Sequence, residues 1–154
     1  MDMVLDRIGL LIRRGIAWWI DSFVAAAIVM VMRWVVNAVA DHPLTGETLE
    51  LYNAIATAVV FYAYRVWVEA TKSTSLGKWS LQLEIIATHP GFFTAFLRNS
   101  WLLLTMLTLA GWPGVMPLLL AILSISMLAS GQTPFDMLAN CLVERRPQID
   151  TPSF

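Results

Sequence analysis

The stretch IRRGIAWWIDSFVAAAIVMVMRW, residues 12–34, is a long apolar run that carries one carboxylate, Asp21, near its start. A helix needs roughly 20 mainly apolar residues to cross about 30 Å of hydrocarbon. Residues 16–39 meet this requirement with Asp21 and Arg33 as their only charges, so they are predicted to form a first membrane-spanning helix. Since a charge at the centre of a span costs about 2.5–3.5 kcal/mol, Asp21 must have a role that offsets this.

The composition also indicates an integral membrane protein. The 154 residues are 58% hydrophobic and 14% charged, whereas soluble domains contain about 45–50% apolar and 25% charged residues. The net charge of −1 gives no broad basic surface for nucleic acid. We therefore expect lipid and other membrane proteins as partners, and no nucleic acid.

Three further spans are predicted, at residues 51–68, 93–110 and 115–130. The last two are separated by GWPGVMP, residues 111–117, whose glycines and prolines favour a turn. A single broken helix with an interfacial tail is the alternative for this region. A second alternative concerns the N-terminus, where AVA at residues 38–40 imitates a signal cleavage site, although the apolar run exceeds the usual about 7–15 residues.

The basic residues orient these spans. With four spans, nine of the ten lysines and arginines fall on one side, which the positive-inside rule assigns to the cytoplasm. The sequence thus predicts an all-α membrane protein with four transmembrane helices and both termini cytoplasmic. The exception, Arg33, lies where it can reach the outer headgroups.

Two cytoplasmic segments have patterns of their own. In WSLQLEII, residues 79–86, apolar and polar residues alternate, which predicts a small β-hairpin or flap between spans two and three; an interfacial helix is the alternative. Residues 134–146 are predicted to form a short amphipathic helix with Thr133 as its N-cap and Asp136 near its N-terminus. Residues 1–146 are then one domain, and residues 147–154 a disordered tail.

Several charges are predicted to lie at one depth, at the inner membrane boundary. Arg14 and Asp21 are two helical turns apart on one face, so a third group between them could contact both. Arg98 and Asp136 come from other spans at the same level, and a ring of alternating charges would result. The nearby Arg65 and Glu69, four residues apart, are interpreted as an ordinary interfacial pair.

These landmarks resemble the RDD family of bacterial membrane proteins. The similarity begins with RGIAWWID, which holds Arg14, Ala17 and Asp21, and continues with TSLGKWSLQLEII and FFTAFLRNSWLLL, which hold Lys78 and Arg98. It ends with FDMLANCLVERR, where Asp136 is retained but Phe135 replaces the family's usual histidine. The same region has Asn140 in place of glycine and Cys141 in place of threonine.

The resemblance implies transport of a cation, a proton or another small ligand through an oligomer. The expected binding residues are Arg14, Asp21, Lys78, Arg98 and Asp136. The alternative is an accessory or scaffolding subunit of a membrane complex, in which these charges are structural. No catalytic motif is present, so we expect no enzyme activity; the single cysteine and two distant histidines also indicate no metal and no cofactor.

Overall fold

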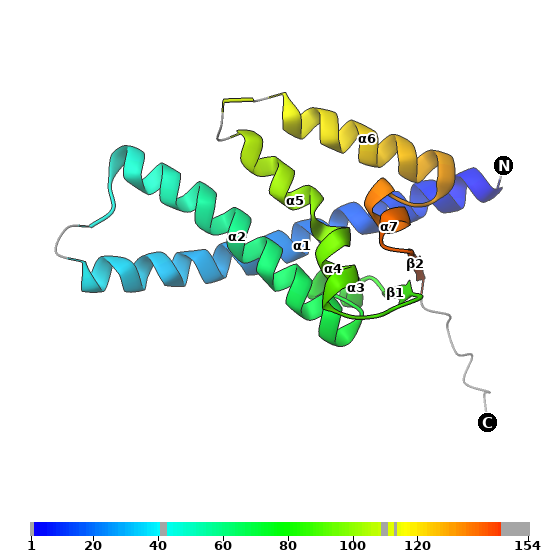
Figure 1. The fold of residues 1–154 in the computed structure, drawn as a ribbon, viewed down its shortest axis with the longest axis horizontal. Coiled ribbons are helices and arrows are strands. Elements are labelled where there is room, and N and C mark those ends of the chain that lie inside the picture. The colour runs from blue at the N-terminus through cyan, green and yellow to red at the C-terminus, as the bar shows by residue number, and fades with distance from the viewer. Residues whose placement is uncertain (1, 41–42, 109–110, 113, 146–154) are drawn as a thin grey trace.

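The computed structural model describes residues 2–40, 43–108, 111–112 and 114–145. Its frame consists of two long helices, α1 (Asp2–Val39) and α2 (Gly46–Lys72). Both are long and apolar enough to cross a membrane. Figure 1 shows α1 running along the longest axis, with α2 meeting its middle and diverging from it toward the connecting loop.

Helix α1 is longer than the span predicted within it. Its 38 residues correspond to about 57 Å at 1.5 Å per residue, nearly twice the hydrocarbon thickness. The prediction began at residue 16 because the charged pair Arg13 and Arg14 comes just before it, but residues 2–15 contain no proline to interrupt the helix. The buried positions of α1 form a narrow stripe at every fourth residue: Ala17, Asp21, Ala25 and Val29.

The predicted third span is divided into shorter pieces. Helix α4 (Phe92–Asn99) is followed by α5 (Trp101–Leu104) and the 3-10 turn η1 (Thr105–Thr108). The chain then turns, and α6 (Val115–Ser130) packs against η1 as the second arm of a hairpin. Because α6 has 16 residues, about 24 Å of helix, it is shorter than a usual span.

The predicted β-hairpin is wrong in its pairing. Strand β1 (Leu83–Ala87) forms where alternation indicated a strand, but its antiparallel partner is β2 (Cys141–Arg145). Ile85 lies opposite Val143, and Ala87 opposite Cys141. The buried side chains of both strands pack with Ala17 of α1, so the sheet is held against the first helix.

The predicted amphipathic helix over residues 134–146 is also wrong in extent. Only α7 (Pro134–Leu138) is helical. It ends before Asn140, whose left-handed φ of 48° redirects the chain into β2. The alternating Cys141 and Val143 then bury one face of the strand in the cluster that contains Ala17. The predicted tail, residues 147–154, lies outside the described residues.

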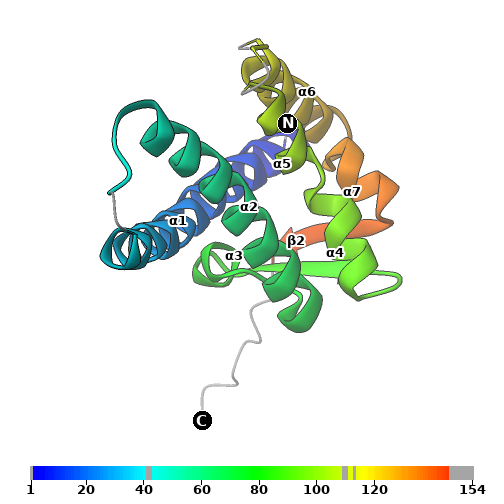
Figure 2. The same cartoon turned by 60° about the vertical axis from the view of Figure 1, so that its left-hand side comes forward.

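The short elements gather at one end of α2. Figures 1 and 2 both show α3 (Leu76–Ser80), the strands, α4 and α7 around this end, close to the middle of α1. A second apolar cluster, formed by Ala25, Phe61 and Leu102, joins α1, α2 and α5. The buried charged residues lie between this cluster and the sheet.

Candidate functional site

Asp21 anchors α3 to α1. Its carboxylate is fully buried and accepts hydrogen bonds from the Ser75 hydroxyl at 2.6 Å and the Gly77 backbone N–H at 2.8 Å. The Tyr64 hydroxyl donates a third at 3.2 Å. Neutral dipoles therefore compensate Asp21, and the partner that the sequence left unidentified is the start of α3.

The same contact explains Gly77. A Cβ at this position would collide with the carbonyl oxygen of Ala17. Only glycine lets α3 approach α1 closely enough for its N–H to reach Asp21. Ser75 also caps α3 by accepting from the Lys78 N–H at 3.4 Å.

Glu69 is a second carboxylate centre, at the C-terminal end of α2. Arg65 lies 2.9 Å from its Oε1, the Lys78 amine contacts the same oxygen, and Asn99 donates to Oε2 at 2.9 Å. Arg65 and Glu69 are 6% and 5% exposed. Interpreting them as an ordinary interfacial pair is therefore wrong, because α2 directs this stripe toward α3 and α4.

Asp136 is the third centre. Its Oδ1 accepts from Arg98 Nε at 2.6 Å, and Arg14 binds Oδ2 from the opposite side. Asp136 and Thr133 also form a reciprocal capping box at the start of α7. The predicted position at a helix N-terminus is thus correct, and the same carboxylate joins α1, α4 and α7.

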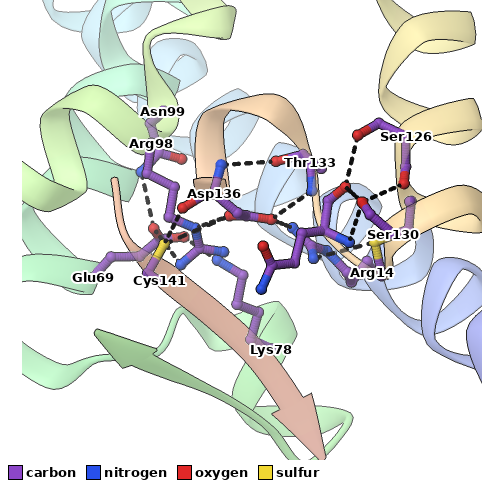
Figure 3. Close-up of polar contacts among 12 residues, drawn as sticks. Arg14, Glu69, Lys78, Arg98, Asn99, Ser126, Ser130, Thr133, Asp136 and Cys141 are labelled. Carbon is purple, nitrogen blue, oxygen red and sulfur yellow. Dashed lines mark hydrogen bonds and ion pairs between the residues drawn. The ribbon is translucent and has the colours of Figure 1, made fainter. Parts of the chain in front are cut away.

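Arg98 links the last two centres. Its Nη1 lies 3.4 Å from Glu69 Oε2, while its Nε binds Asp136. Figure 3 shows Arg98 between these carboxylates, with Arg14 approaching Asp136 from the other side. We call the connected set the ionic cluster; its members are Arg14, Arg65, Glu69, Lys78, Arg98 and Asp136.

The ionic cluster has an excess of positive charge. Four basic side chains face two carboxylates, which leaves two positive charges when all are ionised. Burial lowers the pKa of Lys78 well below its usual range, and Arg65 and Arg98 lower it further against the opposing effect of Glu69. The neighbouring arginines therefore disfavour the protonated form of the Lys78 amine.

The pKa values of Asp136 and Cys141, which lie toward the sheet, are shifted in opposite directions. Burial alone would raise the pKa of Asp136, but Arg98 and Arg14 outweigh it and hold that pKa well below its ordinary value. Burial raises the pKa of the neighbouring Cys141 thiol to about 11. Asp136 is consequently an anion at neutral pH, and Cys141 a neutral thiol without nucleophilic character.

Four of the five predicted site residues are brought together, and the fifth lies beside them. Arg14, Lys78, Arg98 and Asp136 belong to the ionic cluster. Asp21 has separate partners, so no single group bridges it to Arg14 as the two-turn spacing had suggested. Sequence reasoning missed Glu69 as a centre, and its only signal was the i, i+4 spacing from Arg65.

A cavity of about 190 Å³ opens onto the ionic cluster. One side is charged and includes Arg14, Arg65, Lys78, Arg98 and Asp136. The rest of its lining is mostly apolar and comes mainly from α1, α5 and α6, with the polar Asn99, Ser124 and Thr133 among it. Among the residues that the structure describes, no three His, Cys, Asp or Glu side chains gather to hold a metal ion.

A comparison with known families finds a match that covers most of the chain. The sequence model of the RDD family matches residues 8–140, most of the chain. This range begins before Arg14 and includes all six members of the ionic cluster and Asp21. No curated protein and no solved structure matches the chain significantly.

Proposed function

The chain belongs to the RDD family of membrane proteins, and we propose that it serves as a non-catalytic accessory or scaffolding subunit of a larger membrane complex. One observation carries this proposal: each of the three buried carboxylates already has at least three donors. Asp21 has a hydroxyl, a phenol and an N–H, whereas Glu69 and Asp136 have cations. A carboxylate that is already paired is a poor site for another cation.

The contacts support a structural role for these charges. They join α1, α2, α3, α4 and α7, which come from separate parts of the sequence. Arg7 extends the same connection by donating to the Leu128 and Ala129 carbonyls at the end of α6. The sheet and its flanking turns are then held in one orientation, as a docking platform requires.

We further propose that the platform lies at the cytoplasmic face of a bacterial inner membrane, with α1, α2, the α4–η1 segment and α6 as four spans. The ends of these helices that carry Arg14, Lys72, Arg98 and Ser130 lie on the side predicted to be cytoplasmic. Outward large apolar side chains on α1 and α2 suit lipid, a second copy or a partner helix.

Cation or proton transport is the second candidate, and the cavity beside Asp136 is the observation that favours it. Transport would require Asp136 or Asp21 to exchange its present donors for a travelling ion. Because four helices are few for a carrier, the path would have to be completed by an oligomer or a partner.

Flux measurements separate the two functions. Wild-type protein is reconstituted in vesicles containing a pH-sensitive dye, and proton movement is recorded under imposed Na⁺, K⁺ and pH gradients. We expect no flux above protein-free vesicles. A wild-type flux that Asp21→Asn abolishes, in a variant with unchanged melting temperature, would support transport and contradict the accessory role.

The accessory role also predicts a stable partner. A tagged chain is purified from its native membranes in mild detergent, and co-purifying membrane proteins are quantified by mass spectrometry. We expect one of them at a fixed molar ratio to the wild type, and its loss from Arg98→Met, in which the platform is weakened. Arg33→Met, at the far end of α1, is the matched control and should retain it.

A further inference from the structure

The cavity beside the ionic cluster contains hydrogen-bond donors that no protein group uses. In the described part of the chain, four buried side-chain polar atoms have no hydrogen-bond partner, and three of them belong to residues at this cavity: Trp18 Nε1, Arg65 Nε and Arg98 Nη1, the last of which makes only the 3.4 Å ion-pair contact with Glu69. All three residues line the cavity, and the two arginines are 6% and 5% exposed. Buried donors of this kind are rare in proteins unless another molecule accepts from them.

The Asp136 carboxylate, which also lines the cavity, is by contrast occupied. Both oxygens of Asp136 are taken by Arg14, Arg98 and the Thr133 N–H. What the cavity lacks is therefore an acceptor. Even with Lys78 neutral, Arg14, Arg65 and Arg98 outnumber the two carboxylates of the ionic cluster, and this positive excess favours an anionic acceptor over a neutral one.

The remaining wall of the cavity indicates the chemistry of the rest of the bound ligand. It is mostly apolar, with the polar Asn99, Ser124 and Thr133 beside the apolar Leu11, Trp18, Trp101, Leu120, Leu123 and Met127. The cavity is many times the roughly 10–15 Å³ that one water needs on the same measure. A cationic floor beside an apolar wall fits an amphiphile with a charged head, and arginine forks match phosphate oxygens.

We propose that this cavity binds an anionic phospholipid, with its phosphate on Arg14, Arg65 and Arg98 and the start of an acyl chain against Trp101 and α6. The phosphate supplies the acceptors that Trp18, Arg65 and Arg98 lack. At the inner membrane boundary, phosphate groups of anionic lipids are abundant at this depth. The inference uses the membrane placement proposed above but not the accessory role, so either can fail without the other.

The first experiment compares lipids on the detergent-solubilised full chain. Native mass spectrometry counts bound dioleoylphosphatidylglycerol and, at the same concentration, zwitterionic dioleoylphosphatidylcholine. We expect one phosphatidylglycerol bound with about tenfold or greater preference, together with a rise in melting temperature. Equal binding of the two lipids would overturn the proposal.

A second arm distinguishes the lipid from its headgroup. Inorganic phosphate alone is titrated against the melting temperature, and it is then tested as a competitor of phosphatidylglycerol. We expect weak competition, because phosphate cannot use the apolar wall. Binding of inorganic phosphate as tight as that of the lipid would overturn the proposed acyl contact.

Cavity variants locate the binding. Ser124→Leu fills the cavity from α6 without touching the ionic cluster, and we expect about tenfold weaker phosphatidylglycerol binding. Ala121→Leu adds the same side chain to an exposed position of α6 outside the cavity and should bind like the wild type. Identical binding by both variants would place the lipid elsewhere and contradict the proposal.

A milder variant remains informative if Ser124→Leu does not fold. Trp18→Phe removes the unpartnered indole N–H and retains an aromatic ring against Phe61. We expect a several-fold loss of phosphatidylglycerol preference, whereas Trp67→Phe on the exposed face of α2 should cause none. Unchanged preference in Trp18→Phe would show that the indole donates no hydrogen bond to the lipid and would remove that part of the proposal.

Discussion

The protein stabilises its buried carboxylates in two ways, with neutral donors in one region and with cations in the other. Asp21 is surrounded by neutral donors, and its position depends on a close approach between two backbones at Gly77. Glu69 and Asp136 are surrounded by cations that arrive on long side chains from four helices. The first arrangement fixes one element at short range, whereas the second connects many elements and leaves charge unbalanced.

Breaking the ionic cluster at its centre should give the largest effect. Arg98→Met removes the group that joins Glu69 to Asp136, and deletion of one partner of a buried ion pair costs about 3–5 kcal/mol. Thermal unfolding in detergent measures the loss. Arg33→Met, whose arginine forms no ion pair in the part of the chain that the structure describes, should change stability by less than about 0.5 kcal/mol; equal losses would contradict the central role of Arg98.

The Asp21 centre should be most sensitive to added volume. In Gly77→Ala the new methyl group meets the Ala17 carbonyl, so α3 must move away and Asp21 loses its N–H donor. We expect destabilisation of about 1–3 kcal/mol. Gly9→Ala, in open space on α1, is the matched control and should be neutral or stabilising by up to about 1 kcal/mol. A neutral Gly77→Ala would show that the close approach is not needed.

Removing one hydroxyl from each centre tests the contrast directly. Ser75→Ala takes a strong donor from Asp21, which has no cation to compensate, and should cost about 1–2 kcal/mol. Thr133→Ala removes only a helix cap, because Asp136 retains two guanidinium groups, and should cost about 1 kcal/mol. Urea or thermal titrations of the pair measure the difference, and the reverse order would contradict this interpretation of the two centres.

The smallest predicted effect is the pH dependence contributed by Asp136. Its pKa is lower in the folded protein than its ordinary value near 3.8, so its stabilising contribution is complete above that value and declines as the pH falls toward the folded pKa. The wild type should lose about 1 kcal/mol from this group between pH 5 and pH 3. Asp136→Asn should show a flatter profile, and Glu47→Gln, at an exposed residue of α2, should not.

The sequence was sufficient for features that depend on local pattern. Apolar runs identified α1 and α2, and alternation identified β1. The predicted common depth of Arg14, Arg98 and Asp136 correctly suggested that they meet. The resemblance to the RDD family is confirmed by the match over residues 8–140.

Features that depend on packing between distant segments could not be predicted. An i, i+4 pair such as Arg65 and Glu69 has the same spacing on a solvated helix and in a buried cluster. The pairing of β1 with β2 joins two segments far apart in the sequence, and the residue pattern of neither one indicates its partner. The close approach at Gly77 depends on the backbone of Ala17, which no side-chain pattern reports.

The partnership of β1 with β2 also sets an order of events during synthesis. The two strands are separated by more than 50 residues, which take several seconds to make at about 5–20 residues per second. Throughout that interval β1 lacks its partner strand, and Arg14 and Arg98 lack the carboxylate of Asp136. The newborn chain therefore contains both arginines before Asp136 has been made, and the sheet beside α1 can form only after β2 has emerged from the ribosome.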